Sequence, residues 1–202
     1  MDAGARTMPA WEDIMHRPDP DPEPHPLDHL LDLARAAVVA AVDGRPAPAP
    51  DPRACPEMSI PADAFVTLTA GDHLRGCMGT LGADMPVGAA VVRAAGMAAT
   101  RDPRFRPVDA RELGGIRVEV SVLGPPRPLA DPAAFVPGRD GIVVEARGRR
   151  ALLLPQVATE MGWGATEMLD AVCEKAGLRS DAWRDPGTRL SVFEVQRASG
   201  PA

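Results

Sequence analysis

The first long amphipathic pattern in the chain runs from about Leu27 to Val42, where apolar side chains recur at helical spacing. They are Leu27, Leu30, Leu31, Ala34, Ala37, Val38 and Ala41. Because this spacing forms one stripe and Gly44 follows as a stop signal, it predicts a helix on the core. A second helix is predicted from Pro86 to about Thr100, where an alanine-rich run follows a proline. A third is predicted from about Thr166 to Ala176.

Alternating patterns predict strands between these helices. From Ile116 to Leu123 the branched apolar side chains share one face, while Glu119 and Ser121 share the other. Turn residues between short apolar runs predict two hairpins, and a last alternating run predicts one more strand. The predicted segments are 65–69 with 73–79, 141–145 with 150–154, and 189–195. Hairpins with interspersed helices indicate an α+β fold with a largely antiparallel sheet.

Composition sets the organisation around this pattern. The chain has 202 residues, which suits one domain. Proline alternates with acidic residues near the start, so residues 1–26 are predicted to be a disordered extension. Residues 44–63 form a second proline-rich segment, predicted to be a connector on the surface. We therefore expect a single domain over residues 27–197 and a short C-terminal tail over residues 198–202.

Charge and residue usage exclude some functions. A net charge of −6, no tyrosine and 3% aromatic residues argue against a nucleic-acid partner. No apolar stretch is long enough to predict a membrane span or a secretory leader, so we expect a cytoplasmic protein with no membrane partner. The three cysteines and four histidines lack the spacing of metal ligands, and the sequence predicts no metal and no cofactor.

The segment from Leu74 to Gly79 is the most unusual in the chain, because two glycines flank Cys77 beside Arg75. Gly76 and Gly79 indicate bare backbone that another group approaches closely. A guanidinium favours the thiolate of a nearby cysteine, and exposed amides of this segment would hold an anion. The alternative is a buried cysteine in a bulged strand, with the glycines admitting a packed helix. The residues alone leave both interpretations open.

Three other residues are candidates with equally ordinary alternatives. Glu119 interrupts an apolar strand, and in a cleft it would serve as a general acid or base; otherwise it lies on a solvated strand face. Asp102 and Arg104 follow the alanine-rich helix in a Asp-Pro-Arg-Phe turn. They would bind an anionic ligand or, as such pairs more often do, close a local hydrogen-bonded turn.

Several of these segments together resemble one known family. The motifs FVTL, LRGCMGTL, DPRF, VEVSVLGPP, GRDGIVV, LLLPQVA and KAGL occur in this order between Phe65 and Trp183. They are similar to the AmmeMemoRadiSam system protein A domain, also found in the human protein of the Alport syndrome, midface hypoplasia and elliptocytosis chromosomal region. The resemblance implies an α+β domain with a mixed or antiparallel sheet and a smaller lobe. Some relatives have histidine where this chain has Asp140, which weakens any mechanism that needs a histidine there.

The resemblance adds partners to the picture but no reaction. It implies a system that includes a Memo-like protein and a radical S-adenosylmethionine protein. The family motif aligns with Arg75, Gly76, Cys77 and Gly79, which makes them the leading site candidates. One hypothesis is an enzyme or enzyme component in which Cys77 is a nucleophile or acyl carrier and Glu119 moves protons. The other is a non-catalytic module that binds a partner protein or an anionic metabolite at the same segment.

Overall fold

The computed structural model describes residues 25–82 and 84–202, and these form two compact units. The first unit holds the described residues up to Val122 together with Gln196–Ala202, and the second holds Leu123–Val195. The disordered extension predicted for residues 1–26 lies outside the described residues except for its last two. The region expected as one domain with a smaller lobe, residues 27–197, therefore covers the second unit and most of the first.

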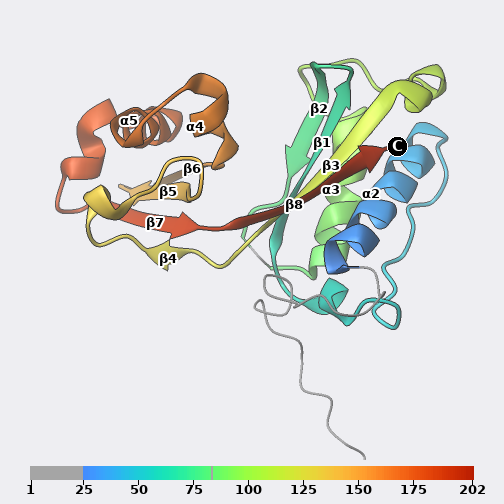
Figure 1. Ribbon diagram of the computed structural model, residues 1–202, viewed down its shortest axis with the longest axis horizontal. Coiled ribbons are helices and arrows are strands. Elements are labelled where there is room, and N and C mark those ends of the chain that lie inside the picture. The colour runs from blue at the N-terminus through green and yellow to red at the C-terminus, as the bar shows by residue number, and fades with distance from the viewer. Residues whose placement is uncertain (1–24, 83) are drawn as a thin grey trace, which may run out of the picture. The chain divides into compact units, whose positions relative to one another are not determined.

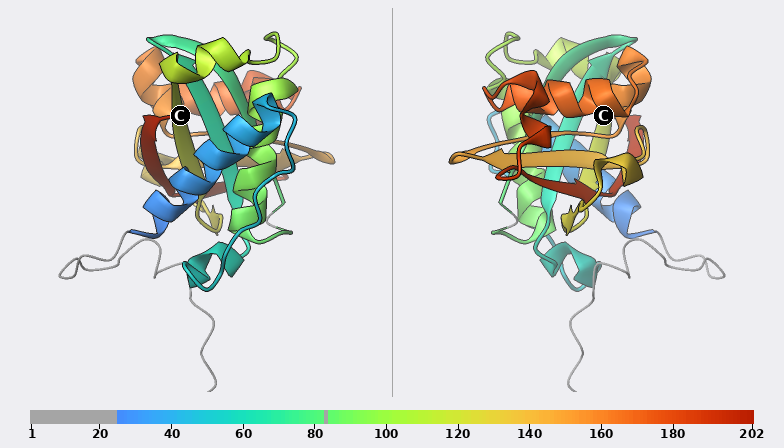
Figure 2. Two further views of the ribbon diagram at one scale, coloured as in Figure 1. Left: turned by 90° about the vertical axis from the view of Figure 1, so that its right-hand side faces the viewer. Right: turned by 90° about the vertical axis from the view of Figure 1, so that its left-hand side faces the viewer.

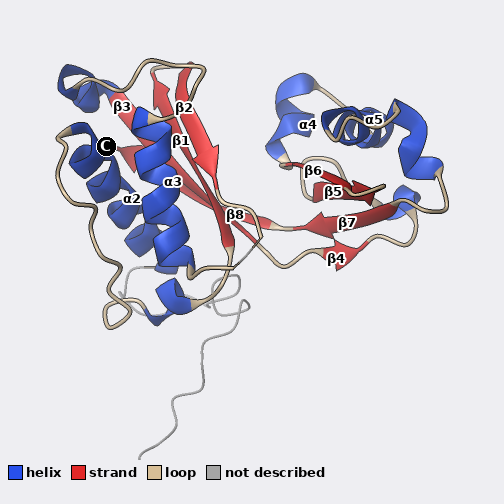
Figure 3. Ribbon diagram, turned by 180° about the vertical axis from the view of Figure 1, so that it is seen from behind, coloured by secondary structure: helices blue, strands red, loops and turns tan. Residues whose placement is uncertain are grey.

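The first unit is a four-stranded sheet in the order β2-β1-β3-β8, with two helices on one face (Figures 1 and 3). Its elements, in chain order, are α2 (Pro26–Val42), η1 (Pro56–Ser59), β1 (Asp63–Ala70), β2 (His73–Gly79), α3 (Val87–Thr100), η2 (Ala110–Gly115), β3 (Ile116–Leu123) and β8 (Val195–Pro201). Strands β1 and β2 form the predicted antiparallel hairpin. Helix α3 packs on both of these strands and on α2.

Alternation in β1 fixes which face of this sheet is covered. Ala64, Val66 and Leu68 are completely buried and belong to one core with the helices. Thr67 and the other intervening residues lie on the face away from α2 and α3, where they are only half-buried. Because neighbouring strands share this alternation, the face away from α2 and α3 also collects polar side chains of β2 and β3.

The ends of α2 and the composition of α3 explain how the helices pack. The His25 side chain accepts a hydrogen bond from the amide of Leu27 and caps α2, while Pro26 occupies the first turn, where no donor is lost. Helix α3 buries a run of small side chains at 0–2% exposure. They are Ala90, Ala94, Ala95, Ala98 and Ala99. Small side chains let the α3 backbone approach the sheet closely, so that the Ala98 carbonyl lies against Gly76 of β2.

The second unit is an antiparallel sheet in the order β4-β7-β5-β6, with two helices (Figure 2). Its elements are β4 (Arg127–Pro128), η3 (Pro132–Ala134), β5 (Gly141–Ala146), β6 (Arg149–Leu153), α4 (Gln156–Met161), α5 (Ala165–Lys175), η4 (Ser180–Arg184) and β7 (Arg189–Phe193). Helix α5 contacts β5 and β6 and buries Met168, Leu169, Val172 and Cys173 against them. The unit therefore has its own core.

The α+β class is confirmed. Residues 198–201, expected to be a C-terminal tail, lie in β8, and the Ala202 amide after it donates to the carbonyl oxygen of Ile116 in β3. Pairing with β3 keeps Gly200 and Pro201 in a strand although both are poor strand formers. None of the described helices is long and apolar enough to cross a membrane.

Candidate functional site around Cys77

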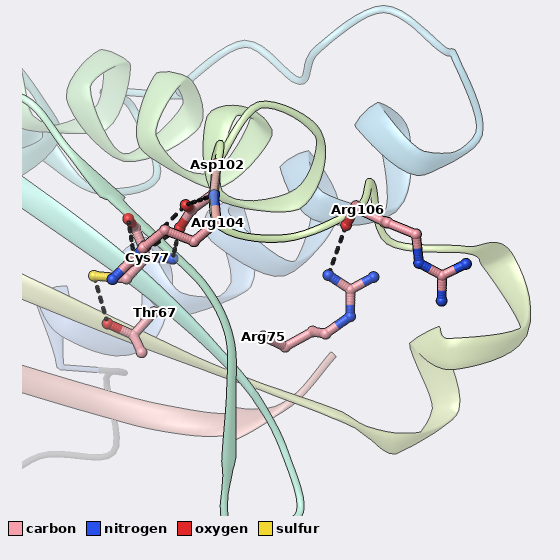
Figure 4. Close-up of polar contacts among 6 residues, drawn as sticks. All are labelled: Thr67, Arg75, Cys77, Asp102, Arg104 and Arg106. Atoms are coloured by element: carbon pink, nitrogen blue, oxygen red, sulfur yellow. Dashed lines mark hydrogen bonds and ion pairs between the residues drawn. The ribbon is translucent and has the colours of Figure 1, made fainter.

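Cys77 lies in β2 directly opposite Thr67 of β1, on the sheet face away from the helices. Its sulfur accepts a hydrogen bond from the Thr67 hydroxyl, with 3.4 Å between Oγ1 and Sγ (Figure 4). The thiol is half-buried rather than enclosed. The bulged strand and a glycine that admits a packed helix, both expected if Cys77 is structural, are present, but the cysteine itself is half-buried and faces away from that helix.

The other two thiols differ from Cys77 in their surroundings. Cys55 is 2% exposed, and burial together with the neighbouring Glu57 raises its pKa to about 11. Cys173 is fully buried in the core of the second unit, and burial raises its pKa as well. Thiols that are buried and protonated react slowly, since the thiolate is the nucleophile. These two cysteines are internal references for the reactivity of Cys77.

Asp102 reaches the backbone of Cys77 from the turn after α3. Its side chain is 2% exposed, and Oδ2 accepts the Cys77 amide at 2.9 Å. Arg104 supplies the remaining donors: its own amide, Nε and Nη2 all bond to the Asp102 carboxylate at 2.7–3.1 Å. Hydrogen bonds from Arg104, and then the Cys77 amide, hold the pKa of Asp102 well below its usual range. The carboxylate thus joins the strand to the turn as a buried, fully bonded anion.

Arg104 is the positive group beside Cys77. Its Nη2 donates to the Cys77 carbonyl oxygen at 3.3 Å, and its side chain is 55% exposed. The pKa of Arg104 is raised, first by its hydrogen bond to Asp102 and further by interaction with the Cys77 side chain. Asp102 uses one edge of the guanidinium, so the exposed remainder is available to a thiolate or to an incoming anion.

Arg75 does not lie beside the thiol. The pairing of β1 and β2 skips it, because Leu68 opposes Gly76 while Thr69 opposes Leu74. Such a bulge re-aims a side chain. The guanidinium forms two bonds to the Glu112 carboxylate, at 2.8 and 3.0 Å, and two more to backbone carbonyl oxygens.

Figure 4 shows Arg75 pointing toward the segment of Arg106, away from Cys77. The hydrogen bond from Arg75, followed by the backbone amide of Asp109, lowers the pKa of Glu112 to about 2. The Arg75 donors are therefore engaged in tying β2 to the loop before β3. The positive charge expected from Arg75 is supplied at Cys77 by Arg104 instead.

The two glycines are approached by the protein itself. A Cβ atom on Gly76 would run into the backbone carbonyl of Ala98 in α3, and one on Gly79 would run into the Phe65 ring. Neither glycine has a positive φ. Of the backbone amides of residues 76–79 that were candidates for binding an external anion, that of Cys77 donates to the Asp102 carboxylate instead. The expected bare backbone is present, and helix α3 and Phe65 occupy it.

Glu119 lies on the same sheet face as Cys77, away from α2 and α3, but not in its immediate surroundings. Strand β1 lies between β2 and β3, so the two backbones are roughly 10 Å apart at ordinary strand spacing. In the described chain, the carboxylate, 32% exposed, faces Ser121 at 3.5 Å and Arg197 of β8 at 3.9 Å. Its proposed role in proton transfer therefore depends on a substrate or partner lying across β1.

The site is thus Cys77 with Thr67, Asp102 and Arg104, drawn from two strands and one turn. Sequence reasoning missed Thr67, although its outward position in the alternating β1 pattern was the available signal. It also missed Glu112, whose pairing with Arg75 spans 37 residues and has no local signature. Among the described residues, no three histidine, cysteine or carboxylate side chains are grouped as metal ligands.

Comparisons with known proteins agree on one family. The family model AMMECR1 matches residues 31–198. A protein of Methanothermobacter thermautotrophicus is 51% identical over 138 residues, covering 65% of this chain and 72% of that protein. A protein of Thermococcus gammatolerans is 39% identical over 189 residues, covering 86% of this chain and 92% of its own. The crystal structure of the uncharacterized protein PH0010 from Pyrococcus horikoshii matches with a TM-score of 0.80 at 35% identity, covering 86% of this chain and 91% of that one.

Proposed function

This chain belongs to the AMMECR1 family, and on that premise we propose that it is an enzyme or enzyme component whose working group is the Cys77 thiol. One observation carries the proposal. Cys77 is the half-buried cysteine of three: its sulfur accepts a hydrogen bond from the Thr67 hydroxyl, its carbonyl oxygen accepts one from the Arg104 guanidinium, and its side chain lies on the sheet face away from α2 and α3.

The chemistry follows from those two neighbours. The Cys77 sulfur acts as a nucleophile or acyl carrier, and the Thr67 hydroxyl orients it through their hydrogen bond. The exposed part of the Arg104 guanidinium holds a negatively charged group of the substrate next to the sulfur. Glu119 moves protons for a substrate that reaches across β1. The proposal assumes a reducing cytoplasm, where a thiol stays free.

Selective alkylation tests the thiol. The native protein is treated with iodoacetamide, and the modification of each cysteine is followed by mass spectrometry. We expect Cys77 to react at least about tenfold faster than Cys55 or Cys173. A Cys77→Ser variant should lose this fast phase and keep the two slow ones. An unchanged fast phase in that variant, at equal fold stability, would show that another thiol is the reactive one.

A second candidate is a binding module. In the described residues the thiol has a hydroxyl and a guanidinium as neighbours and no hydrogen-bonded general base. An anionic group of a partner or metabolite would be bound there without any bond being broken. Following the family resemblance, we propose a Memo-like protein and a radical S-adenosylmethionine protein as the partners.

Joint purification with those two proteins separates the candidates. For the enzyme, a Cys77→Ala chain should still assemble with both partners while product formation by the assembled system is lost. Assembly and product formation that are both unaffected by Cys77→Ala would instead establish the module.

A further inference from the structure

A second polar site lies in the other unit, at the turn of the β5–β6 hairpin. A cavity of about 370 Å³ opens there, formed entirely by residues of the second unit. Its wall consists of Glu145, Ala146, Arg147, Gly148, Arg149, Arg150, Gly187 and Arg189. Figure 2 shows this hairpin extending from the sheet, so the cavity is at an accessible end of the unit. Its volume falls in the range of small-molecule sites.

The charge of this cavity contrasts with that of the chain. Four arginines share the wall with one carboxylate, that of Glu145, in a chain whose net charge is −6. Arg149 pairs with Ala146 and donates to the carbonyl oxygen of Gly177, so its guanidinium lies on the other face of the hairpin from Glu145 and Arg150. Asp185 lies 3.6 Å from Arg147 and also pairs with Arg179. Arg147, Arg150 and Arg189 therefore exceed the nearby carboxylates by about one positive charge. Guanidinium groups in such a cluster repel one another, so an anion bound between them is stabilised.

The ion pairs inside the cavity are of the kind that a ligand displaces. The Glu145 carboxylate forms ion pairs with Nε of Arg150 and Nη2 of Arg189, each at 3.0 Å. The Arg189 side chain is 80% exposed and that of Arg150 is 47% exposed. Exposed pairs of this kind contribute little to stability. Each guanidinium has five N–H donors, and one Glu145 carboxylate cannot use those of two arginines. Arg150 and Arg189 therefore keep N–H donors that can form paired hydrogen bonds to the oxygens of an anion.

The backbone at the turn supplies an independent observation. Arg147 and Gly148 form a two-residue loop, and both have positive φ, 54° and 73°. This geometry favours asparagine, aspartate or glycine at the first position, and a long side chain there costs free energy. Arg147 is the one described residue other than glycine with a positive φ. A strained position held by arginine, at the edge of an arginine-lined cavity, indicates a use for the guanidinium.

We propose that this cavity binds a small phosphorylated molecule. Arg147, Arg150 and Arg189 would contact the phosphate oxygens, and Glu145 holds Arg150 and Arg189 in place before the ligand binds. A polyanion such as RNA is disfavoured, because the overall acidic charge repels it and the cavity is only of small-molecule size. This site is separate from Cys77 and does not depend on its role.

Calorimetric titration with inorganic pyrophosphate tests the site. We expect saturable binding to the full chain with one site per molecule, weakened about tenfold or more in Arg147→Asn. Because asparagine suits the positive φ, that variant should be at least as stable as the wild type, so the loss cannot come from unfolding. Arg127→Gln is the matched control: this arginine is in the same unit and pairs with Glu194 at 3.0 Å, outside the cavity. It should change the affinity less than about twofold.

Glu145→Gln provides a test in the opposite direction. Replacing the carboxylate by a neutral amide frees Arg150 and Arg189 from their ion pairs and raises the net charge of the cavity by one. Pyrophosphate should therefore bind several-fold more tightly. Sodium citrate, titrated in parallel, separates a phosphate site from a general multivalent-anion site; equal affinity for citrate would overturn the phosphate assignment. The proposal as a whole fails if pyrophosphate does not saturate, if Arg147→Asn binds like the wild type, or if Arg127→Gln loses as much affinity. It also fails if Glu145→Gln does not strengthen binding.

Discussion

Replacing Gly76 by alanine is expected to lower the free energy of unfolding by about 3 kcal/mol. The added Cβ would run into the carbonyl oxygen of Ala98, which is backbone of α3 and cannot rotate away. Either β2 or the end of α3 must move, and the Asp102 turn that follows α3 would move with it. Chemical denaturation measures the loss.

Gly96→Ala in the same helix is the control. Its Cβ would meet only the Ala41 side chain, at an ordinary 3.9 Å. Alanine also suits a helix interior better than glycine, so this variant should gain about 0.5–1 kcal/mol. If Gly76→Ala were as stable as the wild type, the close approach of α3 to β2 would be wrong.

Removing the Asp102 carboxylate is expected to have a similarly large effect. Asp102→Ala should destabilise the protein by about 3 kcal/mol at neutral pH, because it leaves the Cys77 amide and the Arg104 donors without their shared acceptor. The exposed Asp32, paired with Arg35 one helical turn along, is the control. Asp32→Ala should cost less than about 0.5 kcal/mol.

The pH dependence of this loss has a definite sign. The pKa of Asp102 is lowered in the folded protein, so its contribution is complete above the unfolded pKa of about 3.9 and is lost as the pH falls toward the folded value. The stability difference between wild type and Asp102→Ala should therefore be constant from pH 7 to about pH 5 and shrink below about pH 4. Asp102→Asn, which keeps the shape, should show the same trend with a smaller loss. A difference that grew on acidification would contradict the ionised, hydrogen-bonded Asp102.

Local patterns predicted most of the helices and strands but not the site; α4 was not predicted, and the strand expected over residues 189–195 is two strands, β7 and β8. The stripe from Leu27 and the alternation from Ile116 to Leu123 each report a single element, and α2 and β3 follow them closely. The meeting of Asp102 with Cys77 joins positions 25 residues apart through the packing of α3 on β2. No periodicity encodes that contact.

The bulge at Arg75 is a second feature of the site that local patterns could not predict. A regular strand would alternate the side chains of 75 and 77 onto one face, which made Arg75 the natural partner for the thiol. One skipped residue in the register re-aims Arg75 toward Glu112, and Arg104 from the following turn takes its place. The residue types at the site were visible in the sequence, whereas their pairing depended on the register of two strands.

The reactivity of Cys77 in the folded chain is the most direct test of the account. In the native protein iodoacetamide should modify Cys77 at least about tenfold faster than Cys55 or Cys173, because folding buries those two thiols and raises their pKa values but leaves Cys77 half-buried. Unfolding in urea should bring the three rates close together. A native Cys77 rate no faster than those of Cys55 and Cys173 would contradict a working thiol at this site.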